Sequence, residues 1–417
     1  MADFFRKLEL DLRLVGMLAA LAFIWVGFDL FTGGEFLTPR NLWNLSVQSA
    51  SIAVMATGMV LVIVTRNIDL SVGSILGFTG MIIGVTQAVL LPHLWGFDHP
   101  LTWIVAVVVA IAVGGVIGAA QGVVIAYLGV SSFIVSLGGL LIWRGAAWWV
   151  TTGQTVAPLD KRFIPIGGGI EGSMGAGPSW AIGIVAVVAA LLFTAAARRR
   201  RQRFGFVVRP PWAEAVVALL IVAAILGAVL VVNAYPLPDG VIRRMQVAAG
   251  ASPDAPLVSI AHGFAIPVLI AVAVGFVMTF IADRTRFGRY VFAIGGNPEA
   301  AELSGINTRK VLTMVFALMG ALAGLSACIA TARLQSATNA TGTLDELYTI
   351  ASAVIGGTSL AGGTGTIYGA MLGAVVMQSL QSGMVLLGLD APLQNIVVGL
   401  VLVIAVWLDT LYRRHVR

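Results

Sequence analysis

Charged residues are scarce in this chain. Asp, Glu, Lys and Arg together make up only 11% of its 417 residues, whereas 59% of the residues are hydrophobic. A soluble domain carries about 25% charged residues. Because so few charges cannot cover a protein with a water-compatible surface, the composition excludes an ordinary soluble protein and indicates one that lies in a lipid bilayer.

Lysine, cysteine and histidine are also rare, and each scarcity excludes a class of site. None of the lysines, Lys7, Lys161 and Lys310, follows a glycine, so the chain lacks the G-x-x-x-x-G-K-[ST] loop that binds nucleotide phosphates. The single cysteine, Cys328, allows neither an internal disulfide nor a cysteine metal cluster, and its place within an apolar segment predicts a buried small residue. The four histidines form no H-E-x-x-H pattern. We therefore expect no catalytic site, no metal and no cofactor in this chain.

Long apolar segments dominate what is present. A helix of about 20 apolar residues crosses the hydrocarbon core of a bilayer, and about twelve such segments can be marked. They are 12–32, 44–65, 71–91, 103–127, 131–151, 179–197, 213–235, 263–282, 311–331, 344–362, 366–388 and 393–411. Two pairs, 44–91 and 344–388, are divided by only a few residues, which predicts hairpins of short or broken helices. The expected fold is all-α: a polytopic membrane protein of about 10–12 transmembrane helices with two broken-helix hairpins, in one domain over residues 1–417.

The distribution of positive charge predicts an orientation. The N-terminal MADFFRKLELDLR is charged and lacks a signal cleavage site, which is typical of a cytoplasmic leader to a retained helix. If the segments alternate from a cytoplasmic N-terminus, 18 of the 25 lysines and arginines fall on the cytoplasmic side. The other seven are Arg40, Arg144, Lys161, Arg162, Arg243, Arg244 and Arg333. Both termini are therefore expected in the cytoplasm, and the net charge of +6 needs no nucleic-acid partner.

Three loops keep more than one interpretation. Residues 153–178 and 236–262 are rich in Gly, Pro and polar residues, and they form either a surface for an extracytoplasmic partner or simple connectors. The run RRRRQR, from Arg198 to Arg203, fits contact with lipid head groups and an orientation signal better than nucleic-acid binding.

Polar residues interrupt the apolar pattern in TRNIDLSVGS, residues 65–74. Arg66, Asn67 and Asp69 are costly at membrane depth unless they are paired or hydrated. One interpretation is structural: Asp69 and Ser71 start a helix, and Arg66 pairs with Asp69. The other is a broken helix beside a substrate path, where irregular backbone is tolerated.

A second interruption, IGGTSLAGGTGT, covers residues 355–366. Its five glycines and four hydroxyl residues do not suit a lipid-facing helix. A phosphate-binding loop is poorly supported because no strand precedes the segment and no lysine follows it. Gly-interrupted segments in corresponding places of two halves point instead to a transport pathway.

Glycines recur at helical spacing in three further segments, where close helix packing is the expected role. They are Gly114, Gly118 and Gly122, then Gly320 and Gly324, then Gly369 and Gly373.

The loop RTRFGRYVFAIGGNPEAAELSGINTRK, residues 284–310, is long and charged. Asn297 can cap, and Pro298 can begin, a short helix that runs to about Ser304 and ends at Gly305. A short amphipathic helix parallel to the membrane suits docking into a groove of a cytoplasmic partner. A helix that merely lies at the interface is the alternative.

Here the sequence resembles a known family. Glu299-Ala300-Ala301, three further residues and then Gly305 resemble the EAA-x-x-x-G coupling loop of permeases of ATP-binding-cassette importers. TRNIDLSVGS, FGRYVFAIGGNPEAAELSGIN and VIGGTSLAGGTGT are similar to three signatures of the ribose/xylose/arabinose branch, in the same order. LTPRNLWNL and SSFIVSLGGLLIWRG also fit, so the likeness covers most of the chain from about residue 35 to 409. The extra pair of spans around RRRRQR resembles the xylose-type permeases of that branch.

The resemblance implies a permease homodimer in the bacterial inner (plasma) membrane. It implies a cytoplasmic ATPase with two fused nucleotide-binding halves, which binds the ATP, and an extracytoplasmic sugar-binding protein that delivers a monosaccharide, D-xylose or a related pentose. The residues that it assigns to coupling are Asn297, Pro298, Glu299, Ala300, Ala301 and Gly305. The path of a neutral sugar needs hydrogen-bonding groups, and the candidates are Asn67, Asp69, Ser71, Ser74, Thr358, Ser359 and Thr364.

The main alternative is a secondary sugar transporter driven by an ion gradient. It would share the broken helices and would more often carry an intramembrane acidic relay, for which Asp69 is the strong candidate. A membrane enzyme that acts on lipid lacks a catalytic cluster here, and a gated channel lacks a filter sequence.

Overall fold

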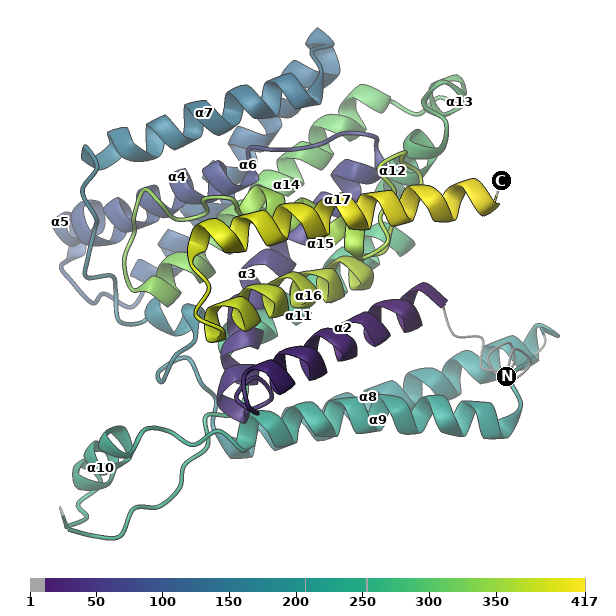
Figure 1. Cartoon of the computed structure of the whole chain (residues 1–417). Coiled ribbons are helices and arrows are strands. Elements are labelled where there is room, and N and C mark those ends of the chain that lie inside the picture. Colours follow the sequence, from purple (N-terminus) through teal and green to yellow (C-terminus); the bar gives the residue numbers. More distant parts are fainter. Residues whose placement is uncertain (1–11, 207, 253, 417) are drawn as a thin grey trace.

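The fold is a bundle of long helices that run roughly parallel or antiparallel to one another (Figure 1). The computed structural model describes residues 12–206, 208–252 and 254–416. Its α-helices, with one π-helical turn (η1) and one 3-10 turn (η2), are α2 (Leu12–Phe31), α3 (Pro39–Val64), α4 (Val72–Val85), η1 (Thr86–Leu90), α5 (Leu91–Trp95), α6 (Thr102–Leu128), α7 (Ser132–Thr151), η2 (Ile164–Gly167), α8 (Ala176–Arg203), α9 (Pro211–Asn233), α10 (Asp239–Ala248), α11 (Ile266–Arg284), α12 (Arg286–Gly296), α13 (Pro298–Leu303), α14 (Thr308–Leu334), α15 (Asp345–Ile355), α16 (Ile367–Leu386) and α17 (Ala391–Val416).

Among the described residues, ten helical runs are long and apolar enough to cross a membrane: α2, α3, α4 with η1 and α5, α6, α7, α8, α9, α11, α14 and α16. These runs coincide with ten of the twelve predicted segments, so the prediction of an all-α polytopic membrane protein is confirmed. At the segment 393–411, α17 has a shorter apolar stretch, Ala391–Ile404. The segment 344–362 is not a span, because the 11-residue helix α15 gives way to a glycine-rich turn after Ile355.

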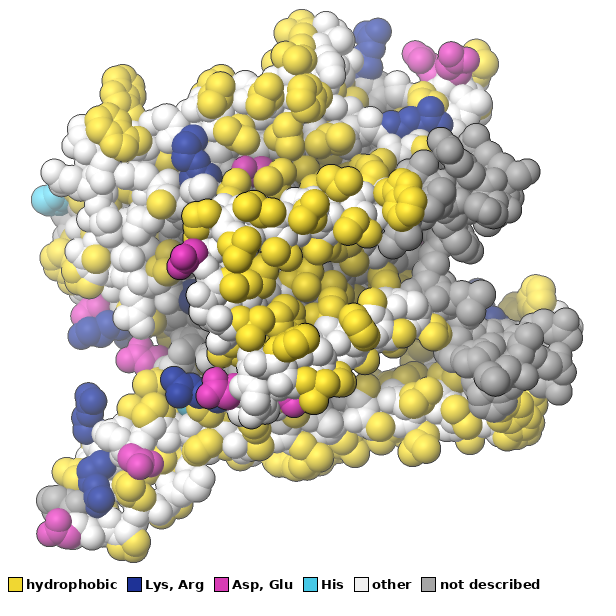
Figure 2. Space-filling model, in the orientation of Figure 1, with side chains coloured by type: hydrophobic (Ala, Val, Ile, Leu, Met, Phe, Trp, Pro, Cys, Tyr) yellow, Lys and Arg dark blue, Asp and Glu magenta, His cyan; other side chains and the backbone are white. Residues whose placement is uncertain are grey.

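The two ends of the bundle differ in what they carry. The start of α2, the end of α17 and the short helix α13 lie at one end, and α10 lies at the other (Figure 1). We call them the α13 end and the α10 end. Hydrophobic side chains cover the visible sides of α16, α17 and the α8–α9 pair, and charged side chains gather towards the two ends (Figure 2). Such an apolar belt between polar ends is the surface expected of a protein surrounded by lipid.

Glycines bring α6 and α14 into close contact through much of the bundle. A Cβ atom on Gly118 would meet the carbonyl oxygen of Phe316, and a Cβ atom on Gly114 would meet that of Gly320. The predicted glycine faces therefore pack helix against helix, with no room for a larger side chain. Cys328 on α14 is fully buried, as its position predicted.

Three irregular segments interrupt the long helices. Two of them, 65–71 between α3 and α4 and 356–366 between α15 and α16, are the predicted breaks. The third, 335–344 between α14 and α15, lies where the sequence predicts a connector between the segments 311–331 and 344–362. The guanidinium group of Arg144 donates to the carbonyl oxygens of Asn339 and Thr341 in this segment, at 3.0 and 2.9 Å. Buried backbone without a helix needs such partners, since lipid offers none.

Helices α4 and α15 both begin inside the bundle, and their first turns meet there. A Cβ atom on Gly73 would meet the carbonyl oxygen of Gly342 and a carboxylate oxygen of Glu346. Acidic residues stand at both starts: Asp69 before α4, and Asp345 with Glu346 in the first turn of α15. Negative side chains favour the positive end of a helix dipole, so these acids suit two helix starts that face each other.

An aromatic cluster ties α3 to the loop before α11 at the α10 end. The ring of His262 lies 4.9 Å from that of Trp43 and 4.1 Å from that of Tyr235, between ring centroids. The indole nitrogen of Trp43 also donates to the carbonyl oxygen of Gly263 at 2.8 Å. Burial lowers the pKa of His262, because a charged imidazole loses its hydration there. The α10 segment extends beyond this cluster as an arm (Figure 1).

Candidate functional site

The three signature segments of the sequence converge at the α13 end. Arg66, which follows α3, extends its guanidinium group to the end of α12. Its Nε donates to the carbonyl oxygen of Gly295 at 2.9 Å, and its Nη2 donates to that of Gly296 at 2.7 Å. Arg66 holds this position with a backbone φ of 63°, which is unusual for a residue with a side chain. In place of an Arg66–Asp69 ion pair, the arginine therefore joins the first signature to the coupling segment.

The glycine-rich segment 356–366 completes this contact, which we call the junction: Val64, Arg66, Gly295, Gly296, Gly362 and Gly363. The N–H of Gly363 donates to the carbonyl oxygen of Val64, the last residue of α3, at 3.0 Å. A Cβ atom on Gly295 would collide with that same carbonyl oxygen and with the backbone of Gly363. The glycines therefore allow three backbones to touch directly, which explains their positions in two signatures.

Helix α13 stands next to the junction and presents an exposed face. The side chain of Asn297 caps it by accepting from the N–H of Ala300 at 3.0 Å, and Pro298 occupies its first turn. Ala301 is 5% exposed and packs inwards, whereas Glu299 is exposed and Leu303 is 89% exposed. The helix ends before Gly305 at a φ of 81°, a conformation that suits glycine. The predicted helix is thus present with the predicted cap, start and stop.

In the first group of predicted pathway residues, Asp69, Ser71 and Ser74 are buried beside the start of α4, and Asn67 is half-buried. One carboxylate oxygen of Asp69 accepts from the N–H of Ser71 at 2.9 Å and from its hydroxyl at 2.6 Å. The Ser71 hydroxyl also lies 3.0 Å from the side-chain oxygen of Gln121 on α6. Ser74 donates to the carbonyl oxygen of Ser71 at 2.7 Å. Asn67, closer to the α13 end, donates to the carbonyl oxygen of Thr65 at 2.8 Å. The helix start expected at Asp69 and Ser71 is therefore formed.

The second group lies in the segment 356–366. Thr358 and Ser359 are fully buried, and their hydroxyl oxygens have no hydrogen-bond partner in the structure. Thr364 lines a cavity of about 280 Å³ together with Phe292 and Tyr368. A buried hydroxyl without a hydrogen-bond partner is costly, so Thr358 and Ser359 are candidates for groups that change partners during function.

A polar cavity that was not predicted from the sequence lies nearer the α10 end. It has a volume of about 470 Å³ and lies between α3, α14, α16 and the start of α15. The side chains that give it a polar lining are Asn41, Asn44, Gln48, Ser51, Arg333, Thr341, Asp345, Gln378, Gln381 and Ser382. The signal was available: polar residues of α3 at 41, 44, 48 and 51 follow the helical period and mark one face of an otherwise apolar span.

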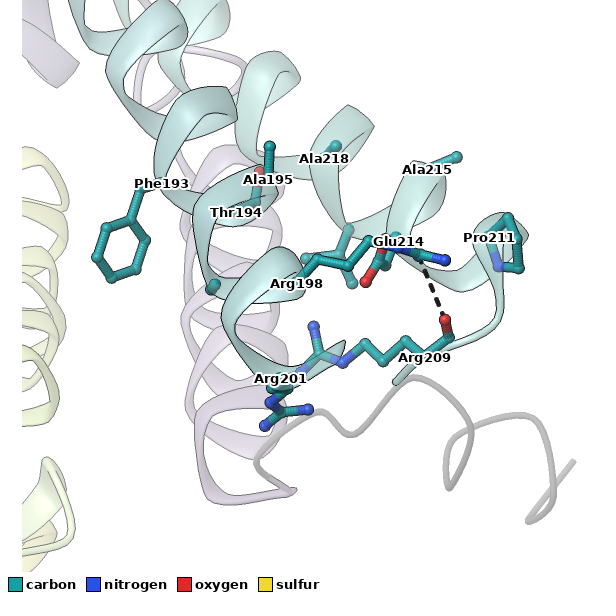
Figure 3. Close-up of a pocket in the computed structure, with 12 residues that line it drawn as sticks. Phe193, Thr194, Ala195, Arg198, Arg201, Arg209, Pro211, Glu214, Ala215 and Ala218 are labelled. Atoms are coloured by element: carbon teal, nitrogen blue, oxygen red, sulfur yellow. Dashed lines mark hydrogen bonds and ion pairs between the residues drawn. The ribbon is translucent and has the colours of Figure 1, made fainter. Parts of the chain in front are cut away.

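A further cavity, of about 520 Å³, opens between α8 and α9 at the α13 end (Figure 3). Arg198 contacts the carboxylate of Glu214 and donates to the carbonyl oxygen of Arg209 at 3.4 Å. Arg201 and Arg209 also line this cavity. The basic run of the sequence therefore lies at the end of α8, next to the turn into α9, and its contact with lipid head groups stays a prediction.

Comparison with known proteins places the chain in a family of membrane permeases. Residues 41–209 and 179–406 match the family described as branched-chain amino acid transport system / permease component. The chain belongs to this family. It is a permease component, which agrees with the lack of a phosphate-binding loop in its sequence.

Three relatives are similar over almost the whole chain. The xylose transport system permease protein XylH of Escherichia coli K12 is 36% identical over 409 residues, which cover 98% of this chain and 94% of that protein. The ribose import permease protein RbsC of the same strain is 33% identical over 378 residues, 90% of this chain and 87% of that protein. The galactose/methyl galactoside import permease protein MglC of Salmonella typhimurium LT2 is 29% identical over 405 residues, 95% and 94% respectively. No solved structure matches the chain.

Proposed function

We propose that this chain is the transmembrane permease subunit of an ATP-binding-cassette importer that carries a monosaccharide, D-xylose or a related pentose, across the bacterial inner membrane. The observation that carries the proposal is the junction, where an exposed short helix connects to both interrupted segments through Arg66 and Gly363. The permease relatives, all named for sugars, support the substrate class.

The α13 end is proposed to face the cytoplasm. The arginines from Arg198 to Arg203 form the last turns of α8, and Arg209 follows in the turn to α9. Arg284 ends α11, Arg289 lies in α12, and Lys310 lies in the first turn of α14. An excess of Lys and Arg marks cytoplasmic loops. Both chain termini then lie in the cytoplasm, since α2 starts and α17 ends at this end (Figure 1).

The coupling mechanism follows from these contacts. A separate ATPase with two fused nucleotide-binding halves binds the exposed face of α13, with Glu299 and the apolar Leu303 at the contact. When ATP draws the halves together, α13 and α12 move, and Arg66 with Gly363 passes the motion to α3 and to the segment before α16. ATP drives transport only through its differential affinity for the two arrangements.

Two further partners complete the proposed importer. A second copy of the chain forms a homodimer around the sugar path. An extracytoplasmic sugar-binding protein docks at the α10 end, where the loops 153–178 and 236–262 present exposed residues such as Glu171 and Arg244. The supporting observation is the α10 arm, which reaches beyond the bundle at that end (Figure 1).

The proposed sugar path includes the hydroxyl and amide groups predicted from sequence. Asn67, Asp69, Ser71 and Ser74 stand on one side of it, and Thr364 stands on the other. Thr358 and Ser359 belong to it because their hydroxyls lack partners in this arrangement and gain them when the segment 356–366 moves. Sugar uptake by Ser71→Ala, Asn67→Ala and Thr358→Val proteins tests this; wild-type rates and unchanged sugar affinity in all three would remove these residues from the path.

The coupling proposal is tested with Glu299→Lys and Gly305→Pro in the full complex. We expect both proteins to insert normally, to copurify poorly with the ATPase, and to lose sugar uptake. Glu171→Lys, which makes the same charge change at the α10 end, should leave copurification with the ATPase intact. Normal copurification and normal uptake in the two test variants would refute the proposal.

The alternative, a secondary transporter, differs in its energy source. In proteoliposomes that contain the permease, the ATPase and the binding protein, ATP-driven uptake should continue after an ionophore collapses the ion gradients. Uptake that requires an ion gradient and does not depend on ATP would instead establish a secondary transporter.

A further inference from the structure

The polar cavity between α3, α14, α15 and α16 has the chemistry of a sugar site. We propose that it binds the monosaccharide itself, after release at the α10 end, through the carboxamide groups of Asn44, Gln48 and Gln381. This inference rests on the proposed function, because it names the site at which the importer's substrate is held.

The walls of the cavity are two helix faces that carry uncharged hydrogen-bonding groups. On α3, residues 41, 44, 48 and 51 are spaced by three or four positions, so their side chains lie on one face. On α16, Gln381 and Ser382 lie three and four positions after Gln378, so the three side chains lie towards one face, and they line the same cavity. Polar side chains inside a membrane protein are energetically costly unless they line a substrate path or bind a ligand. Amide side chains that face one another from two helices are therefore explained best by one common ligand.

The amides of the two walls are within reach of each other and keep capacity for a ligand. The amide nitrogen of Gln378 donates to the side-chain oxygen of Gln381 at 2.7 Å and to that of Gln48 at 3.4 Å. Ser382 donates to the side-chain oxygen of Asn41 at 3.0 Å. Each carboxamide offers two donors and two acceptor sites. These contacts use only part of that capacity, which leaves donors and acceptors for the hydroxyls of a sugar.

The charges and the size of the cavity favour a neutral small ligand. Arg333 and Asp345 are the two ionisable side chains among the described residues that line it, one basic and one acidic, so the lining has no excess of either type. Its volume of about 470 Å³ lies within the range of about 300–1,000 Å³ that is usual for small-molecule sites. Apolar side chains, among them Val47 and Ile329, complete the lining and can contact the C–H faces of a sugar ring.

The lining also suits a ligand that must leave again. No aromatic side chain is among the described residues that line the cavity, so a sugar ring finds no stacking platform there. Gly342 and Asp345 also line the cavity, and Asp345 is the first residue of the inward helix α15. A bound sugar therefore contacts the start of the helix whose other end leads into the segment 356–366 and the junction.

Uptake measurements on the complete importer test the site. We expect Gln48→Leu and Gln381→Leu each to raise the KM for sugar, measured with saturating binding protein, by about fivefold, the effect of one lost hydrogen bond. The hydrolysis of ATP stimulated by unloaded binding protein should stay the same. Ser46→Ala, on α3 but outside the cavity and bonded to the carbonyl oxygen of Trp43, is the matched control and should match the wild type.

A second measurement does not depend on turnover or on the leucine variants folding well. Asn44→Cys should react with a small maleimide added from the α10 side, and millimolar D-xylose should protect it, whereas the charged xylonate should not. The natural cysteine, Cys328, is buried, and any labelling of it is the background of the experiment. A Cys328→Ala version of the protein removes this background. The proposal is overturned if Asn44→Cys does not react with the maleimide, or if D-xylose does not slow its reaction.

The outcomes separate this inference from the proposed function. If the wild-type complex imports sugar but the glutamine variants keep the wild-type KM, the cavity proposal fails and the function stands. If the wild-type complex imports no monosaccharide with ATP, the proposed function itself fails.

Discussion

Replacement of Arg66 is the most direct test of the junction. In the Arg66→Ala protein, the bonds to Gly295 and Gly296 are lost. A hydrogen bond from a charged group contributes about 1.5–3 kcal/mol when buried. The bond from Nη2 to Gly296 is exposed and contributes only a few tenths of this energy. The bond from Nε to Gly295 therefore accounts for most of the energy that is lost. The Nε bond is itself only partly buried, so the expected loss is about 1.5 kcal/mol, or about tenfold in the equilibrium that holds α12 against α3.

The assay separates stability from coupling. We expect Arg66→Ala to lower the midpoint of thermal unfolding and to raise the number of ATP molecules hydrolysed per sugar imported. Arg66→Gly also loses both bonds, but it relieves the left-handed backbone at φ 63° by about 1 kcal/mol. The Arg66→Gly protein should therefore unfold at a higher temperature than Arg66→Ala. Its number of ATP molecules hydrolysed per sugar imported should be raised to the same degree.

Matched controls define the refutation. Arg66→Lys keeps the charge but not the two-pronged donor, and we expect intermediate coupling. Arg199→Ala removes an exposed arginine at the same end of the bundle, and it should resemble the wild type. If Arg66→Ala and Arg66→Gly both import sugar with the wild-type ratio of ATP to sugar, the junction does not transmit the motion.

Two further predictions concern packing and pH. Gly118→Ala, whose Cβ would meet the Phe316 carbonyl, should cost about 1–3 kcal/mol of stability, measured by thermal unfolding, whereas Gly138→Ala, with open space around it, should be neutral or slightly stabilising. Because burial lowers the pKa of His262, the unfolded chain binds a proton first as the pH falls, so stability should decrease below the usual histidine pKa of about 6.5. His262→Phe should flatten this dependence, and an unchanged pH slope in that variant would contradict the assignment.

The sequence predicts the spans and the coupling segment well because local chemistry determines them. Hydropathy alone locates ten membrane helices. Asn297, Pro298 and Gly305 set the start and end of α13 by cap, ring and backbone conformation, which are properties of single residues. The start and the end of α13 are each decided within about one helical turn, so predicting them needs no knowledge of distant contacts.

The remainder depends on contacts between distant segments. The sequence does not reveal that Arg66 bonds to residues 295 and 296, because this partner is chosen by tertiary packing and Asp69 is a nearer charge. The connector at 335–344 lies between two predicted segments, but the sequence does not reveal that Arg144 of α7 donates hydrogen bonds to its carbonyl oxygens. The spacing of polar residues on α3 shows one wall of the polar cavity, but the sequence does not reveal the second wall, because Gln48 and Gln378 are 330 positions apart and meet only in the fold.

The junction and the proposed sugar site are joined by the same two helices. Helix α3 ends at Val64 in the junction and carries Gln48 in the cavity wall. Helix α16 follows the segment of Gly363 and carries Gln381 in the opposite wall. At the junction these backbones touch without side chains between them, so a displacement of α12 cannot be absorbed by side-chain rotation and must move both helices. A relative tilt of two rigid helices at one end changes their separation at the other. The width of the proposed sugar site is therefore controlled from the surface that the ATPase is proposed to bind.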